Sequence, residues 1–217
     1  SMVPNSALII TSLHTGYVQH IDVQALGAIA KADETRIFLE VLPGSFVHVG
    51  MPLARIVSLS KPREGEQQSS SEKIISTLTI GVRRTFEHDP RFGLSVLSEI
   101  ASRALSPAVN DPGTAIDVIG RGIRSLTCWG KPKAPAAKID TDCQQVYLRA
   151  LTVDDLFDDF FAPIARDGAG LVEVDLRMMK ALVCLAQINP AMFSSACTRH
   201  AGLLLKHANN ALVLEED

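Results

Sequence analysis

The sequence lacks any long hydrophobic segment. Its longest apolar stretches, such as residues 181–186, fall far short of the roughly 20 apolar residues that cross a bilayer. The N-terminus also lacks the basic stretch followed by an apolar stretch that marks a secretory signal peptide, and Ser1-Met2 is typical of the remnant left when a tag is removed. The 217 residues themselves are therefore expected to be soluble.

Neither sign of charge predominates. The sequence has 21 lysines and arginines against 24 aspartates and glutamates, which gives a formal net charge of −3. Domains dedicated to nucleic acid usually carry a clear excess of basic residues. No nucleic-acid partner is therefore predicted, although the basic residues between 121 and 149 could touch anionic headgroups if the domain is tethered to a membrane.

Paired cysteines and known catalytic motifs are missing too. The four cysteines, Cys128, Cys143, Cys184 and Cys197, are widely spaced and form no C-x-x-C pair, which argues against a zinc site and a disulfide framework. The sequence contains no G-x-S-x-G, no P-loop and no H-E-x-x-H. We therefore expect reduced thiols, no metal, no cofactor and no catalytic residue, so a non-enzymatic role is favoured over an enzymatic one.

One stretch without aliphatic residues divides the sequence. Residues 61–73 cannot contribute to a hydrophobic core and predict a linker or mobile loop. Before it, short alternating segments and glycine or proline turns predict strands at residues 16–21, 36–42, 45–49 and 53–59, with a helix that Asp22 caps. The rhythm of residues 43–56 is similar to the hairpin of biotinyl or lipoyl barrel-sandwich modules, but the carrier lysine is missing, so the similarity concerns shape alone.

After this stretch the apolar residues follow the period of a helix. Helices are predicted at residues 74–87, 90–105, 112–127, 171–188 and 190–214, with another that Thr152 caps; residues 130–142 predict an exposed excursion and residues 145–151 a strand. The predicted fold class is α+β. It comprises a small β-rich, barrel-sandwich-like module (1–60), the linker (61–73) and a mainly α-helical domain (74–217).

Two runs in the predicted helical domain are rich in polar residues. Residues 84–94 read Arg-Thr-Phe-Glu-His-Asp-Pro-Arg-Phe-Gly-Leu, and residues 103–115 read Arg-Ala-Leu-Ser-Pro-Ala-Val-Asn-Asp-Pro-Gly-Thr-Ala. Together they resemble the central signature of the DUF2254 family, which consists of predicted bacterial membrane proteins of uncharacterised function. Weaker similarity extends the resemblance over roughly residues 15 to 215.

The resemblance implies a location rather than a reaction. Family members carry a block of transmembrane helices ahead of this region, so the chain is expected to be the soluble C-terminal part of an inner-membrane protein, with Ser1 marking the cut. The unpaired cysteines and the even number of spans that the family implies favour the cytoplasmic side.

Seven polar residues of the signature form the candidate ligand-binding set: Arg84, Asp89, Arg103, Ser106, Asn110, Asp111 and Thr114. Three interpretations remain open. The first is a structural network in which Arg84 and Arg103 fix a helix crossing and residues 106–111 form a capped turn. The second is a small-anion site at the helix N-terminus that follows Asp111. The third is a catalytic centre that uses His88, Asp89 and Asp111.

Two other polar patterns could in principle bind metal ions. Asp154, Asp155, Asp158 and Asp159 recur at helical spacing, but no glycine-bearing loop accompanies them, so a solvated helix face is favoured. His200 and His207 share a helix face but lie about 10 Å apart along its axis, too far to bind one ion together.

Two functions therefore stay in view. The favoured one is a non-enzymatic extramembrane domain that assembles, gates or regulates the parent transmembrane block, as a homo-oligomer in which the helix over residues 192–214 serves as an interface. The alternative is an anion- or small-ligand-sensing, or enzymatic, domain whose site is the loop over residues 103–114.

Overall fold

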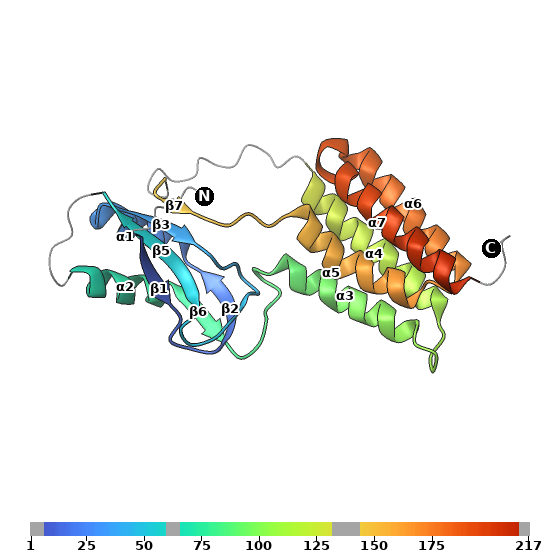
Figure 1. The fold of residues 1–217 in the computed structure, drawn as a ribbon, viewed down its shortest axis with the longest axis horizontal. Helices are drawn as coiled ribbons and strands as arrows, with labels where there is room; N and C mark the ends of the chain where they lie inside the picture. Colours follow the sequence, from blue (N-terminus) through green and yellow to red (C-terminus); the bar gives the residue numbers. More distant parts are fainter. Residues whose placement is uncertain (1–6, 60–65, 132–143, 213–217) are drawn as a thin grey trace. The chain divides into compact units, whose positions relative to one another are not determined.

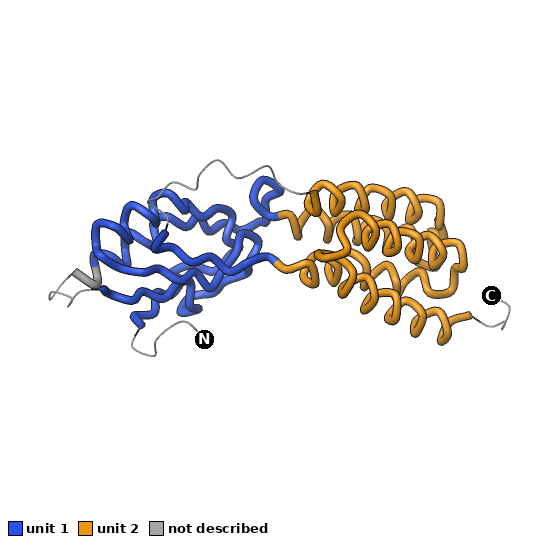
Figure 2. The backbone as a smooth tube through the Cα atoms, turned by 90° about the horizontal axis from the view of Figure 1, so that it is seen from above, with its two compact units in different colours: residues 1–89, 134–151 blue, residues 90–133, 152–217 orange. Residues whose placement is uncertain are grey.

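The computed structural model describes residues 7–59, 66–131 and 144–212, and these residues form two compact units (Figure 2). The first unit comprises residues 1–89 and 134–151, and the second comprises residues 90–133 and 152–217. Strands lie in the first unit and long helices in the second, so the predicted α+β class is confirmed.

Two small sheets and two helices make up the described part of the first unit (Figure 1). One sheet has the order β1-β5-β3-β7, with β1 at Leu8–Thr11, β5 at Pro52–Ser58, β3 at Thr35–Leu39 and β7 at Val146–Tyr147. The other has the order β4-β2-β6, with β4 at Phe46–Val47, β2 at Gly16–Ile21 and β6 at Leu78–Gly81. Neighbouring strands are antiparallel except β3 and β7. The helices are α1, Val23–Ala32, which Asp22 caps as predicted, and α2, Glu66–Ser76.

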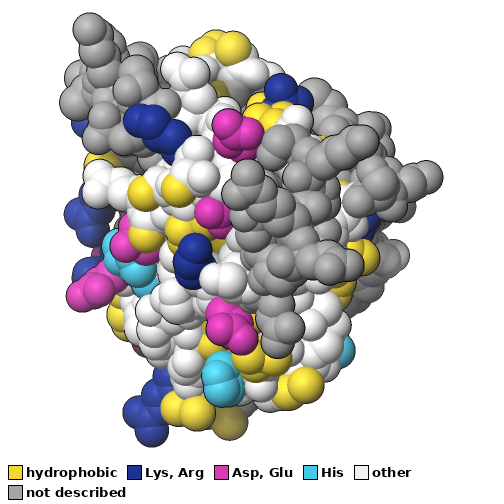
Figure 3. Space-filling view, turned by 90° about the vertical axis from the view of Figure 1, so that its left-hand side faces the viewer, with side chains coloured by type: hydrophobic (Ala, Val, Ile, Leu, Met, Phe, Trp, Pro, Cys, Tyr) yellow, Lys and Arg dark blue, Asp and Glu magenta, His cyan; other side chains and the backbone are white. Residues whose placement is uncertain are grey.

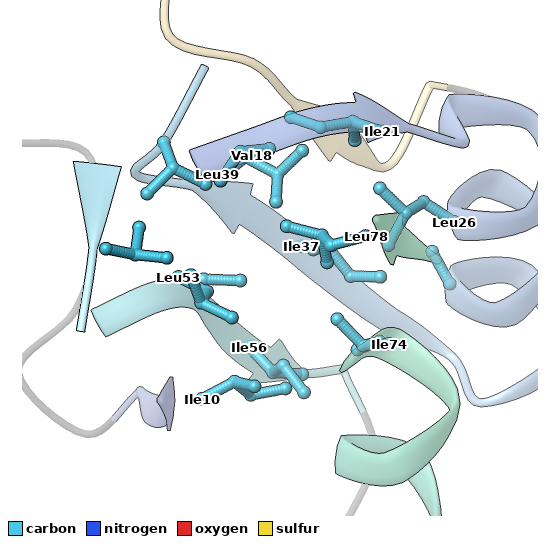
Figure 4. Packing of buried hydrophobic residues seen from close by; sticks show 14 residues of the cluster. Ile10, Val18, Ile21, Leu26, Ile37, Leu39, Leu53, Ile56, Ile74 and Leu78 are labelled. Carbon is cyan, nitrogen blue, oxygen red and sulfur yellow. The ribbon is translucent and has the colours of Figure 1, made fainter. Parts of the chain in front are cut away.

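Both sheets and both helices share one hydrophobic core. Ile37 of β3 is fully buried near Leu26 of α1 and Leu78 of β6 (Figure 4). The alternation of buried and exposed positions along β3 is the period-two pattern of a strand with one face in a core. Ile74 of α2 is also fully buried, which explains how a mostly polar segment is held as a helix against this core.

The prediction of a single helix over residues 74–87 is wrong. The helix α2 ends at Ser76, and residues 78–81 form β6, which pairs with β2. Leu78 is buried in the core, whereas Val82 and Phe86, expected on the same buried stripe, are exposed. The segment from Leu78 therefore extends along the edge of β2, where its backbone completes the three-stranded sheet.

The neighbouring expectations also change. Residues 66–73, predicted to be part of the linker, belong to α2, while residues 61–65 lie outside the described part of the chain. The strand β1 was not predicted, and the strand expected at residues 145–151 is limited to Val146 and Tyr147. The excursion predicted at residues 130–142 lies almost wholly outside the described residues, and α4 continues through its first residue, Gly130.

Five helices form the described part of the second unit: α3 (Pro90–Ala104), α4 (Pro112–Gly130), α5 (Val153–Asp167), α6 (Val172–Ile188) and α7 (Pro190–Ala211). They pack in the order α3, α4, α6, α7, α5 and back to α3. Their core includes the buried rings of Phe157, Phe160, Phe161 and Phe193. The capping predictions at Asp111 and Thr152 are confirmed, with Pro112 at the first helical position.

Candidate functional site

The seven candidate residues fall into two groups, each within its own compact unit. Arg84 and Asp89 precede α3 and belong to the first unit. The other five belong to the second unit, where they lie at the end of α3, in the turn that follows it and in the first turn of α4: Arg103, Ser106, Asn110, Asp111 and Thr114. Each group is therefore described by itself.

Arg84 and Asp89 form an ion pair with two hydrogen bonds. The Arg84 Nε donates to Asp89 Oδ2 at 2.7 Å, and Nη2 donates to Oδ1 at 3.0 Å. The Asp89 side chain is only 2% exposed, so its charge is removed from water and requires this arginine. Two parallel bonds also fix the orientation of the guanidinium group.

The Asp89 carboxylate packs on the backbone of Gly44. A β-carbon at position 44 would lie 2.2 Å from Asp89 Oδ2, and Gly44 has a φ of +89°, so only glycine fits this turn. The Gly44 N–H donates to the carbonyl of Val18 at 2.7 Å. The ion pair thus holds the segment after β6 against the turn that precedes β4.

The turn between α3 and α4 is built by backbone hydrogen bonds. The Ser106 carbonyl accepts from the N–H groups of Val109 at 3.0 Å and Asn110 at 2.9 Å, and the Ser106 hydroxyl donates to the Arg103 carbonyl at 2.7 Å. Asn110 has a φ of +48°, a left-handed conformation that asparagine tolerates better than most residues. The polar residues of this run therefore form the capped turn that the sequence predicts.

Asp111 uses its carboxylate to cap α4. It accepts from the Thr114 N–H at 3.0 Å and from the Thr114 hydroxyl at 2.6 Å. These hydrogen bonds from Thr114 lower the pKa of Asp111, so the carboxylate is stabilised in its charged form. The negative charge that favours a helix N-terminus is thus supplied by the chain itself.

The buried role expected for Arg103 is wrong. Its side chain is exposed, and within the described residues it makes no hydrogen bond or ion pair. Glu99, one helical turn earlier, is exposed as well. Arg103 therefore does not fix a helix crossing, and its guanidinium group faces solvent.

The three residues considered for catalysis are not brought together within either unit. Asp111 belongs to the second unit, whereas His88 and Asp89 belong to the first. The Asp89 carboxylate is bonded to Arg84, and the exposed His88 ring packs 4.6 Å from the ring of His20. Of the two carboxylates in this set, Asp89 is held by Arg84 and Asp111 caps α4.

Two arginines that the sequence analysis did not single out engage the acidic face of α5. Arg91 of α3 bonds Asp159 with Nε–Oδ2 2.6 Å and Nη2–Oδ1 2.9 Å, and its Nη1 lies 3.5 Å from Asp155 Oδ1. The interpretation of this face as merely solvated is therefore incomplete. These carboxylates connect neighbouring helices.

The other two aspartates of this face, Asp154 and Asp158, lie toward α7. Arg199 approaches Asp154 at 2.9 Å and Asp158 at 2.8 Å. Among the described residues, no group of three histidine, cysteine or acidic side chains is arranged to hold a metal ion. The four aspartates together with two arginines form what we call the arginine clasp: Arg91, Asp154, Asp155, Asp158, Asp159 and Arg199.

Two further ionisable groups are buried in the second unit. The His200 side chain is almost fully buried beside the rings of Phe157 and Phe161, with Nε2 3.2 Å from Asp158 Oδ1. Burial, followed by the charge of Arg199, lowers the pKa of His200, so its ring is neutral at pH 7. Both carboxylate oxygens of Asp175 are buried without a hydrogen bond from the described residues, and this burial raises the pKa of Asp175 to about 6.

Comparison with known proteins supplies the family. A family described as predicted membrane protein (DUF2254) matches residues 1–183. Uncharacterized proteins of Mycobacterium tuberculosis (Rv1290c) and Mycobacterium bovis (Mb1321c) are each 34% identical over 116 residues, which cover 54% of this chain and 22% of theirs. The chain thus spans about a fifth of the curated relatives it matches. No solved structure matches it.

None of the described helices is both long enough and apolar enough to cross a bilayer. The match covers most of the sequence and includes both runs of the central signature. The chain belongs to the DUF2254 family of predicted membrane proteins.

Proposed function

We propose that this chain is an extramembrane domain of a bacterial inner-membrane protein, with a non-enzymatic role in assembling, gating or regulating the parent transmembrane block. The observation that supports this proposal is how the polar groups of the signature are used. Asp89 pairs with Arg84, and Asp111 caps α4, so both carboxylates stabilise the fold of their own units. They are not arranged around a reacting group.

Cytoplasmic placement is part of the same proposal. Cys128 and Cys184 are exposed free thiols, and Cys197 is a buried one. Exposed unpaired cysteines are typical of a reducing compartment. Labelling intact cells with a membrane-impermeant maleimide tests this placement: Cys184 should react only after the cells are permeabilised, and reaction in intact cells would contradict a cytoplasmic location.

Self-association is the second part of the proposal, and the structure changes where we place the interface. The helix over residues 192–214 was expected to supply it, but the two large exposed apolar residues of α7, Met192 and Leu205, are 13 residues apart and lie on different faces of the helix. On α6, Leu176 and Val183 are both about half exposed and are seven residues apart, so they share one helix face. This pair is the apolar surface on which we centre a homo-oligomer.

Sedimentation velocity on the 217-residue chain tests self-association. We expect a discrete oligomer that Val183→Glu weakens by about tenfold or more, because a charge would be buried at the contact. Ile100→Glu is the matched control, since Ile100 is similarly exposed on α3. A chain that is monomeric up to about 100 μM, or an oligomer equally weakened by the control, would contradict this part of the proposal.

Anion sensing remains the alternative, and the exposed guanidinium of Arg103 favours it. The Asp111 carboxylate opposes it, because it holds a negative charge at the N-terminus where an anion would bind. Titration calorimetry with inorganic phosphate decides between the two: heat that disappears in Arg103→Ala supports sensing, and the absence of heat supports the non-enzymatic, non-sensing role.

A further inference from the structure

Three loops of the first unit meet at one end of its three-stranded sheet. The register pairs Gly16 at the start of β2 with Val47 at the end of β4, and Tyr17 with Gly81 at the end of β6. The loops that adjoin these positions, residues 12–15, 48–51 and 82–86, are therefore neighbours. In Figure 1 they lie along the lower edge of this unit. We call them the apolar loop tips.

Each of the three loops exposes a large aliphatic side chain. Leu13 is 60% exposed, Val49 is 62% exposed and Val82 is 84% exposed. Single exposed apolar residues are ordinary on protein surfaces, but their concentration on adjacent loop tips marks an interaction surface. Figure 3 shows hydrophobic side chains beside a histidine and a basic side chain at the lower edge of this unit.

Hydrogen bonds hold two of these tips to each other. The Ser12 N–H donates to the Met51 carbonyl at 2.8 Å, and the Gly50 N–H donates to the Ser12 carbonyl at 2.9 Å. Gly50, with a φ of +84°, occupies the third position of a turn closed by the Met51 N–H and the His48 carbonyl. Val49 therefore projects from the apex of a fixed turn. Binding through Val49 requires little additional ordering of this loop.

The third loop is tied to the same sheet. The Gln19 side-chain amide on β2 donates to the Arg83 carbonyl at 2.7 Å. This bond holds the backbone next to Val82, the most exposed of the three aliphatic residues. All three tips are thus positioned by the sheet.

The charge of the apolar loop tips is positive or neutral. The three loops contain no aspartate or glutamate, and they contain His14, His48, Arg83 and Arg84. Arg84 is neutralised by Asp89, whereas the side chains of Arg83 and both histidines are exposed. The exposed Glu87 follows in the same loop, beyond the tip. Aliphatic side chains accompanied by basic groups are the combination that enters the interface of an anionic bilayer.

We propose that the apolar loop tips insert into the headgroup region of a bilayer that contains anionic lipid. This inference rests on the proposed extramembrane location and names the surface of the domain that faces the membrane. Leu13, Val49 and Val82 enter the apolar boundary, while Arg83 binds lipid phosphate groups. A protein partner is less well matched, because it would require complementary acidic groups of its own, whereas an anionic lipid surface supplies negative charge everywhere.

Vesicle sedimentation with the 217-residue chain tests the proposal. The probes are vesicles of phosphatidylcholine alone and of phosphatidylcholine with about 30 mol% phosphatidylglycerol. We expect binding to the anionic vesicles only. The variant Leu13→Ser/Val49→Ser/Val82→Ser should bind about tenfold less, and Arg83→Ser several-fold less.

Matched substitutions in the second unit provide the controls. Ile100→Ser/Leu205→Ser removes two exposed aliphatic side chains, and Arg177→Ser removes an exposed arginine. These variants should bind like the unmodified chain. Equal losses in the controls, or no binding of any chain to anionic vesicles, would overturn the proposal.

A fluorescence measurement reports insertion directly. Trp129 of α4 is the single tryptophan of the unmodified chain, and its quenching by bromine-labelled lipid gives the baseline. The Val49→Trp variant adds a second indole at the loop apex, whose emission should shift to the blue and be quenched strongly. If the emission and quenching of Val49→Trp equal those of the unmodified chain while the chain still self-associates, the loop tips do not insert into the membrane. The proposed function would then stand without this membrane-facing surface.

Discussion

The ring of Phe160 on α5 lies against the backbone of Gly122 on α4. A β-carbon at position 122 would fall 2.0 Å from the ring Cζ, and the Phe160 side chain is fully buried. Gly122 is therefore present because the phenyl ring occupies the space of a side chain. The close approach is a packing requirement at the centre of the five-helix unit.

Gly122→Ala should destabilise the chain although alanine favours helices. The gain in helix propensity is about 1 kcal/mol, while overpacking a buried ring costs about 1 to 3 kcal/mol. Because the added β-carbon would lie 2.0 Å from the ring, the cost falls at the upper end and the net change is a loss. Urea unfolding measures the difference. Gly202→Ala on α7 is the control, because nothing lies within 4 Å of its added β-carbon and it should be neutral or stabilising. Equal effects at the two positions would contradict the packing argument.

Arg84→Ala should cost about 2 to 4 kcal/mol of unfolding free energy, because it leaves the Asp89 carboxylate buried without its main counter-charge. Arg83→Ala is the matched control, since the exposed Arg83 side chain should contribute less than about 0.5 kcal/mol. Arg84→Ala/Asp89→Asn should recover part of the loss, because it removes the stranded charge. A double variant that is no more stable than Arg84→Ala would argue against the ion pair as the cause.

The segment after Ser76 shows why part of the first unit could not be predicted. Ile75, Leu78 and Val82 have helical spacing, while Leu78 and Ile80 also alternate as in a strand, so the local pattern fits both. Pairing with β2 decides for the strand, and β2 lies far earlier in the sequence. By contrast, α4 was predicted well because its start depends on Asp111 and the proline that follows it.

The candidate site divides in the same way between local and distant contacts. The capped turn at residues 106–111 was predictable because its hydrogen bonds join residues close in sequence. The arginine clasp was not, since Arg91 and Asp159 are 68 residues apart and each alone is typical of a solvated helix face. The exposure of Arg103 depends on how α3 is rotated in its unit, which local spacing leaves undetermined.

Asp175→Asn should stabilise the chain at neutral pH and lose this advantage in acid. Because the pKa of Asp175 in the folded chain is raised from its ordinary value of 3.8 to about 6, its charge destabilises the fold above pH 6 and is neutralised as the pH falls. After allowance for partial solvation, the gain at pH 7.5 should be about 1 to 2 kcal/mol. Urea unfolding from pH 4 to 8 measures it; a constant difference between variant and parent would refute the titration.

His200 should produce the opposite dependence on pH. Its pKa is lowered from the ordinary value of 6.5 by burial and by Arg199, so the unfolded chain takes up a proton more readily than the folded chain. The stability supplied by the neutral ring is complete above pH 6.5 and is lost as the pH falls through the depressed pKa. His200→Gln should flatten this loss relative to His207→Gln, which changes a less buried histidine of the same helix. Identical pH profiles for both variants would show that His200 does not titrate in this way.

The arginine clasp predicts how the acidic face of α5 responds to calcium. In the unmodified chain all four carboxylates lie within ion-pair distance of Arg91 or Arg199, so a divalent cation must displace a guanidinium group to bind. The melting temperature of the 217-residue chain should therefore change by less than about 1 °C when millimolar Ca²⁺ is added. Arg91→Ala/Arg199→Ala removes both cations and leaves two pairs of aspartates, 154/158 and 155/159, each one helical turn apart. The double variant should lose about 1 to 2 kcal/mol of unfolding free energy and melt at a lower temperature. Ca²⁺ should restore part of this loss, because it screens the repulsion between the carboxylates.

Arg121→Ala is the control, because its ion pair with Asp117 lies on the surface of α4. A calcium-dependent shift in the parent chain as large as that in the double variant would show that the aspartates bind metal despite the arginines.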